Sequence, residues 1–273
     1  MNSLKPYERN VLSVAEAMKL LEGYVAPKDA KAPPKPISSL DDFLVLENIS
    51  CVDADGRIFE QYDKLLVRKD IYRSADSNQV NFSPYNAAVH SESVGLFLPS
   101  FALTCNILKR LYEQRSDPDI EKVLQQYKDK GNGNGWHAQN TIINYATSEV
   151  IHYPSAIDFD QSVNVNTSQT RVPLPFSKSS LEDALLKDAL VDASVKMYVQ
   201  QLTGLSHPEI LIEIGKYFGK PARLWFPWNR KKGSQCKEKR AAWLGCYNGN
   251  LILNGCNNLN SNNVARGVRR SGE

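Results

Sequence analysis

The chain has 273 residues, 42% apolar and 23% charged, so it can bury a substantial core and lacks the composition of a disordered protein. Its net charge of +3 is too weak to indicate a general nucleic-acid-binding surface, and no apolar run reaches the length of a transmembrane helix. Its five cysteines are widely spaced, which argues against a zinc site or a disulfide framework and favours free thiols. Because the first residues lack a secretory signal, we expect a cytosolic protein or a virion protein assembled in the cytosol.

The first part of the chain predicts a helix, a linker and a pair of strands. Capping-box spacing and an apolar face predict a helix over residues 10–24. Four prolines among lysines then indicate a linker over 27–36. Between residues 43 and 73, two β-rich runs flank a turn at Ala54-Asp55-Gly56.

Two helices and a hairpin are expected next. Apolar spacing predicts a helix over 100–114, and an Asp-Pro pair begins a second helix over 117–131. Three glycines in the five residues 131–135 predict a loop. The β-rich runs 141–146 and 148–153, joined at Thr147, predict a hairpin.

The following stretch is irregular, with a strand expected near 171–174, and then becomes helical. A long helix is predicted from a cap at Ser180 to Gly204, with Asp192 as the one polar residue near its apolar stripe. A second helix is predicted over 208–219, followed by an aromatic strand over 221–228.

The tail predicts three short strands over 241–247, 250–253 and 264–269. Helices followed by several short antiparallel strands are typical of an α+β fold and not of a doubly wound α/β fold.

The most informative segment is rich in asparagine. Eight of the sixteen residues from 248 to 263 are asparagine, a residue that forms helices and strands poorly. Stability alone would not select this density. Because Trp243 and the apolar residues of 264–268 bracket the run, we interpret it as a tolerant surface mounted on a fixed frame.

This tail resembles the C-terminus of the C-type-lectin-fold variable proteins that retroelements diversify. The matching residues are Ala242-Trp243, then Tyr247-Asn248-Gly249-Asn250, the Asn-rich run, and Arg266-Gly267-Val268-Arg269. The resemblance covers roughly 165–273 and is best over 241–269, although many members end Gly-Phe-Arg or Arg-Pro-Val-Arg instead. In that family, adenine-directed mutagenesis rewrites codons such as AAC, and an unmutated AAC encodes asparagine.

The resemblance implies a C-type-lectin-like fold in the C-terminal half and a hypervariable, ligand-facing surface. Antiparallel strands are held by backbone hydrogen bonds, so outward side chains can vary while their neighbours keep the core. Tyr247 is the expected binding hot spot. The expected ligand-facing residues are Cys246, Tyr247, Asn248, Asn250, Ile252, Asn254, Cys256, Asn257, Asn258, Asn260, Asn262 and Asn263.

We therefore expect a binding protein and not an enzyme, with a protein or glycan ligand, no cofactor and no metal. No nucleic-acid binding or membrane insertion is expected, and homo-oligomerisation is left open. The expected regions are a helix and linker over 1–40, an α+β region of unassigned role over 41–160, and the C-type-lectin-like domain over 161–273. Members of the family sit on phage or viral tails or on cell surfaces.

Two alternatives remain open. The first is a viral or phage structural protein whose Asn-rich tail meets no variable target. The second is a cysteine hydrolase, because Cys105, His137 and Asn140 occur in the order of a cysteine-hydrolase triad. A cysteine among apolar residues in mid-helix is normally inert, which disfavours the hydrolase. The tryptophans Trp225, Trp228 and Trp243 could stack on a sugar or a peptide, but tryptophans within strand patterns more often belong to the core, where we expect these three.

Overall fold

The computed structural model describes residues 39–72, 81–129, 135–145, 147, 149–153, 170–173, 183–225, 228–229, 234–235, 239–257 and 264–271. The helix predicted over 10–24 and the linker over 27–36 lie outside these residues. Residues 36–273 form one compact unit of α+β structure, as expected from the order of elements. None of the described helices has the length and apolarity needed to cross a membrane.

A three-stranded antiparallel sheet contains the first and last described strands. Its order is β1 (Phe43–Val52), β2 (Ile58–Arg68) and β12 (Val268–Arg270), and a short 3-10 helix (Leu40–Asp42) leads into β1. The two predicted β-rich runs are thus confirmed as a hairpin. One face packs against helix α3 (Phe101–Glu113), through buried residues such as Leu46 and Leu65.

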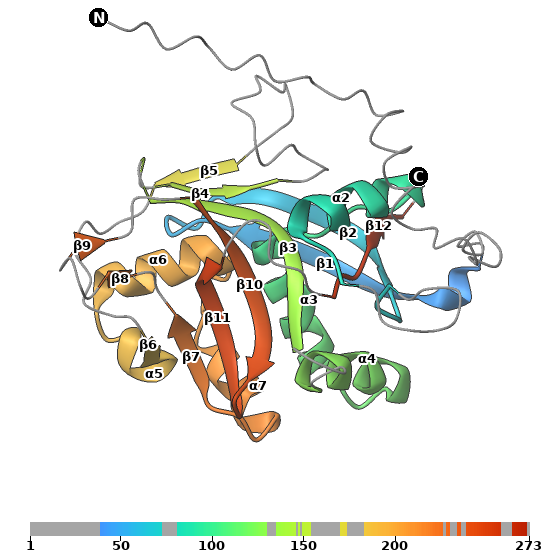
Figure 1. The fold of residues 1–273 in the computed structure, drawn as a ribbon. Coiled ribbons are helices and arrows are strands. Elements are labelled where there is room, and N and C mark those ends of the chain that lie inside the picture. Colours follow the sequence, from blue (N-terminus) through green and yellow to red (C-terminus); the bar gives the residue numbers. More distant parts are fainter. Residues whose placement is uncertain are drawn as a thin grey trace, which may run out of the picture. The chain divides into compact units, whose positions relative to one another are not determined.

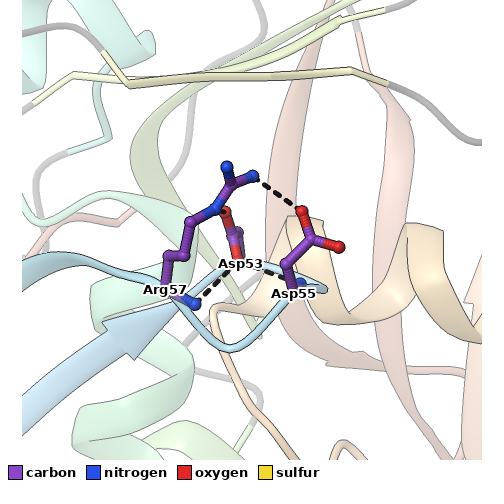
Figure 2. A network of polar contacts seen from close by, with 3 residues as sticks. All are labelled: Asp53, Asp55 and Arg57. Atoms are coloured by element: carbon purple, nitrogen blue, oxygen red, sulfur yellow. Dashed lines mark hydrogen bonds and ion pairs between the residues drawn. The ribbon is translucent and has the colours of Figure 1, made fainter.

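Charged side chains hold the turn between β1 and β2 (Figure 2). The Asp53 carboxylate accepts hydrogen bonds from the backbone N–H groups of Asp55 and Arg57, each 2.9 Å long. The Arg57 guanidinium bridges back to Asp53 at 2.8 Å and to Asp55 at 2.7 Å. Gly56 supplies the left-handed backbone, with φ of 81°. The predicted turn is confirmed, and these hydrogen bonds explain why it forms there.

Three helices follow: α2 (Pro84–Ser93), α3 and α4 (Pro118–Lys128). The Ser100 hydroxyl caps α3 by accepting from the Leu103 N–H, and the Asp117 carboxylate caps α4. Helix α3 is the buried centre of the fold, because it packs against β1, α4, α6 (Ala193–Thr203) and α7 (Ile210–Tyr217). Both helices predicted between 100 and 131 are confirmed, and the predicted loop has only Gly135 among the described residues, where it begins a strand.

The largest sheet has seven strands (Figure 1). In spatial order the strands are β5 (Thr170–Pro173), β4 (Glu149–His152), β3 (Gly135–Asn144), β10 (Lys239–Tyr247), β11 (Asn250–Asn257), β7 (Ala222–Trp225) and β6 (Asp183–Leu185). Its only parallel pair among the described strands is β11 with β7. The predicted hairpin around Thr147 and the strand near 171–174 are confirmed as β3, β4 and β5. A separate pair joins β8 (Trp228–Asn229) to β9 (Ser234–Gln235).

The long helix predicted from Ser180 is wrong over its first part. The chain instead forms β6, a short helix α5 (Leu186–Ala189) and helix α6 (Ala193–Thr203). Asp192 causes the break, because its carboxylate caps α6 by accepting from the N–H groups of Ser194 and Val195. The predicted stop is confirmed, since Gly204 ends α6 with φ of 62°. The next helix, α7 (Ile210–Tyr217), lies within the predicted 208–219.

The C-terminal strand is shorter than the predicted 264–269. Before Val268 the chain makes only an isolated bridge from Val264 to His137. The reason is Arg266, whose buried guanidinium donates to the backbone carbonyls of Arg68 and Lys69 and so holds this stretch against the end of β2.

The predicted boundary between 160 and 161 does not separate two compact units. Strand β3, before it, is hydrogen-bonded to β10, after it, and β2 pairs in the same way with β12. One continuous core contains residues from both sides, including Leu46, Leu202 and Leu253.

Candidate ligand-binding surface

The hairpin formed by β10 and β11 ends in an exposed two-residue turn. Asn248 and Gly249 both have left-handed backbones, with φ of 47° and 75°. Positive φ at both central residues defines a type I′ turn, for which Asn-Gly is a preferred sequence. The Asn250 amide donates a 2.9 Å hydrogen bond to the Asn248 carbonyl. The expected strand, turn and strand are therefore confirmed.

The register of the hairpin sorts its residues onto two faces. Tyr247 lies opposite Asn250, Gly245 opposite Ile252, and Trp243 opposite Asn254. Because residues opposite one another share a face and faces alternate along a strand, these six residues belong to one face, here the outer face. The other face, the inner face, joins the main core and carries Ala242, Leu244, Cys246, Leu251 and Leu253.

The predicted ligand-facing residues divide sharply in exposure. Asn248 is exposed, and Tyr247 and Asn250 are half-buried. Cys246 and Ile252 are 0% exposed and Asn254 is 1% exposed, so the expectation that these three side chains face a ligand is wrong for this structure. Cys246 points into the core, where burial raises the pKa of its thiol to about 11. Ile252 and Asn254 lie in mid-sheet, between β10 and β7.

The side chains of the other six predicted residues lie outside the described part of the chain. Cys256 and Asn257 end β11, where the register sets Asn257 opposite Ala241, but their side chains lie outside the described residues. Asn258, Asn260, Asn262 and Asn263 also lie outside the described residues.

Four aromatic residues gather on the outer face. We call Trp136, Trp225, Trp243 and Tyr247 the aromatic platform. The ring centroids of Trp136 and Tyr247 are 5.9 Å apart and stacked, and those of Trp225 and Tyr247 are 6.0 Å apart in an edge contact. Trp136 and Trp225 also approach to 5.9 Å. Trp243 packs beneath with Ile252, and the core position predicted for Trp243 is confirmed at 2% exposure.

The platform depends on residues that the sequence analysis did not single out. Trp136 lies on β3 opposite Gly245, which has no side chain and so leaves room above β10 for the neighbouring rings. Trp225 is only half-buried, and the side chain of Trp228 lies outside the described residues. Only the register between β3 and β10 brings Trp136 to this face, and the sequence contained no signal for that pairing.

Two donors on this face have no acceptor. The indole Nε1 atoms of Trp225 and Trp243 are buried and have no hydrogen-bond partner in the described part of the chain. Nearby, the Arg223 guanidinium donates to the Asp183 carboxylate at 2.7 Å, so these opposite charges are paired. An indole N–H can only donate, and both Nε1 atoms are buried, so neither donor is presented at the surface.

The residues of the hydrolase alternative are buried apart from this face. Cys105 lies inside α3 at 0% exposure, and burial raises the pKa of its thiol well above the ordinary value. Burial lowers the pKa of His137 to about 3, and its ring stacks on Tyr127 with centroids 4.4 Å apart. A protonated thiol and a neutral imidazole do not form the ion pair that activates a cysteine nucleophile.

A second buried histidine joins elements of the frame. His152 on β4 lies 3.0 Å from the Thr141 hydroxyl through Nδ1, and its Nε2 donates to the Gln201 carbonyl at 2.9 Å. The Thr141 hydroxyl oxygen also accepts from the N–H of Phe101, at 2.8 Å. Burial lowers the pKa of His152 to about 4, so the ring is neutral near pH 7. This network connects β3 and β4 to helices α3 and α6.

Within the described ranges, no three side chains of His, Cys, Asp or Glu gather in a group that could hold a metal ion. No protein-family model, curated protein or solved structure matches the chain. The function must therefore be inferred from the chemistry of the residues themselves.

Proposed function

We propose that this chain is a ligand-recognition protein that binds a protein or glycan through the open end of the β10–β11 hairpin. The observation that carries the proposal is the division of that hairpin into a packed inner face and an outer face whose end is accessible. At that end, Tyr247, Asn248 and Asn250 combine an aromatic ring with two amide side chains. Rings supply contact area at a low entropy cost, and amides supply adaptable hydrogen bonds.

The frame behind this end supports a binding role. Strand β10 pairs with β3 over most of its length, and β11 pairs with β7 from Leu251 to Asn254, so the backbone is held from both sides there. The inner-face leucines Leu244, Leu251 and Leu253 are each at most 1% exposed and anchor the hairpin in the core. Substitutions at the accessible end therefore leave the fold intact.

We further propose that the frame is a C-type-lectin-like fold whose tail a retroelement diversifies. Support comes from the asparagine density of residues 248–263 and from the bracketing Trp243 and Arg266, both buried. Since Cys246, Ile252 and Asn254 are buried, diversification would act at Tyr247, Asn248, Asn250 and from Cys256 onward. A structural or assembly role is the second candidate, and the burial of Asn254 favours it for that part of the tail.

Sequencing the gene across many isolates separates these two candidates. Under the proposal, substitutions concentrate in codons 247, 248, 250 and 256–263, arise at adenines, and spare the inner-face codons 244, 251 and 253. A near-copy of the segment beside a reverse-transcriptase gene is also expected. A tail that is no more variable than the rest of the chain would instead establish the structural role.

A display library tests the frame directly. We expect full-length chains randomised at 247, 248 and 250 to remain resistant to protease, whereas a matched library randomised at 244, 251 and 253 yields mostly unfolded chains. Equal loss of folded members in the two libraries would refute the division into a tolerant and an intolerant face.

A further inference from the structure

At the accessible end of the outer face, the rings of Tyr247 and Trp225 meet nearly at right angles, with an interplanar angle of 81°. Tyr247 and Trp225 are half-buried and in edge contact, while Trp136 lies stacked behind Tyr247. None of the large apolar side chains that are exposed in the described residues lies on β3, β7, β10 or β11. The described part of this surface therefore offers aromatic rings and amides, and no exposed aliphatic side chain against which an apolar peptide side chain could pack.

The amides of the turn define the second requirement on a ligand. Asn248 is exposed and Asn250 is half-buried, so their side chains offer both donors and acceptors beside the ring of Tyr247. The indole Nε1 atoms of Trp225 and Trp243 are buried and do not reach this surface. A ligand with several hydroxyl groups therefore fits the accessible end.

The third requirement is electrical neutrality. Arg223 and Asp183 are the charged residues of β7 and β6 nearest the platform, and they neutralise one another across 2.7 Å. An anionic ligand such as a phosphate, or a cationic peptide, would meet no unpaired opposite charge in the described parts of these strands.

We infer that the platform binds a neutral saccharide, with one sugar ring lying against Tyr247 and Trp225. The C–H face of a sugar ring carries slight positive charge and packs on the negative face of an aromatic ring. Its hydroxyl groups donate to the side-chain amide oxygens of Asn248 and Asn250 and accept from their amide N–H groups. This inference rests on the proposed function and names the ligand class for the same surface.

The test is a titration of the full-length protein, followed by tryptophan emission and calorimetry. The probes are neutral tetrasaccharides built from glucose, mannose, galactose or N-acetylglucosamine. We expect saturable binding of at least one probe, with little change as salt is raised, because no ion pair forms. Tyr247→Ala should weaken that binding by about tenfold, which corresponds to the loss of one stacking contact.

Conservative variants separate contact from folding. Tyr247→Phe keeps the ring and should retain binding, whereas Trp225→Phe replaces the indole by a smaller ring and should weaken binding about fivefold. Tyr217→Ala is the matched control, since Tyr217 is 38% exposed on α7 and lies off this sheet. Thermal melts should show that all four variants are folded.

Three outcomes would overturn the inference: no saturable binding of any probe, binding that Tyr247→Ala leaves intact, or a preference for sulfated or sialylated probes that salt abolishes. If a protein ligand is found whose binding needs Tyr247, while no saccharide binds, the proposed function stands and the saccharide assignment falls. If substitution of Tyr247 and Asn248 weakens binding of no ligand, the proposed function and the saccharide assignment are both refuted.

Discussion

The two long hairpins of this protein are built in different ways. In β1–β2, the turn is held by side chains, with Asp53 and Arg57 closing the loop by charged hydrogen bonds. In β10–β11, the turn is held by backbone conformation at Asn248 and Gly249. The first hairpin lies in a three-stranded sheet, and the second lies in the middle of seven strands, where both faces of its paired strands are buried. The difference shows that the paired strands of a hairpin can be fixed in the core while the side chains at its turn remain free to vary.

The largest effect is expected on the inner face of the second hairpin. Leu253→Ala removes a side chain that is 0% exposed, so we expect the free energy of unfolding to fall by about 3 kcal/mol. Asn250→Ala, at the accessible end of the same strand, should change it by less than about 0.5 kcal/mol. Urea denaturation of the two variants measures both values. Similar losses of stability would contradict the proposed difference between the buried strands and the accessible turn.

Acid should weaken the frame of the second hairpin. The pKa of His152 is about 4 in the folded protein because of burial, against 6.5 when exposed. The unfolded chain therefore binds the proton more readily, and stability is complete above pH 6.5 and falls as the pH drops towards 4. The loss from this histidine can reach about 3 kcal/mol at the lower limit.

The variant His152→Gln checks this assignment. Its amide can still donate to the Gln201 carbonyl, but it does not titrate, so the dependence of unfolding on pH should become shallower between pH 6.5 and 4. His137, whose pKa is lowered to about 3, should leave a residual slope in that variant. An unchanged pH profile would show that His152 does not report on folding.

A medium effect is expected at Gly255, where β11 passes close to two tyrosines. A Cβ there would lie 2.5 Å from the Tyr198 hydroxyl and 2.9 Å from the Tyr145 hydroxyl. We expect Gly255→Ala to destabilise the protein by about 2 kcal/mol through overpacking. Tyr198→Phe removes the nearest atom and should recover part of the loss in the double variant, as thermal melts can establish. If the losses of the two single variants simply add in the double variant, the overpacking does not involve the Tyr198 hydroxyl.

The smallest effect is expected at the side-chain-held turn. Arg57 is 75% exposed, so Arg57→Ala should lower stability only slightly, and the loss should be smaller at high salt. Gly249→Ala in the other hairpin meets open space but keeps φ of 75°, and it should cost about 1 kcal/mol at any salt concentration. Denaturation at low and high salt compares the two, and equal salt sensitivity would contradict the proposed difference.

Local signals in the sequence predicted much of the secondary structure. Ser100 and Asp117 begin helices as capping residues, and Gly204 ends one, because each acts within one turn of the chain. Asp192 shows the limit of this approach. Its carboxylate was interpreted as one polar residue beside a helical stripe, whereas it caps a new helix after β6 has paired with β7.

The candidate surface could be predicted only at its end. The Asn-Gly sequence predicts its own turn, but the burial of Ile252 depends on packing with Trp136 and Trp243 from β3 and β10. Asn254 is also buried, and nothing in the sequence of β11 indicates this. Trp136 joins the platform through pairing with Gly245, more than a hundred residues later in the chain. Alternation within one strand tells which side chains share a face, and it does not tell what covers that face.

The pairing of β2 with β12 has a consequence for how the protein folds. Arg266 binds the carbonyl of Arg68, 198 residues earlier, and β12 completes the sheet from the same end of the chain. When β1 and β2 leave the ribosome, β12 has not yet been synthesised, so its pairing with β2 must come later. Contacts between residues so distant in sequence also form slowly. Until β12 is in place, the edge of β2 that it will cover is open to pairing with other chains, which favours aggregation of the early hairpin.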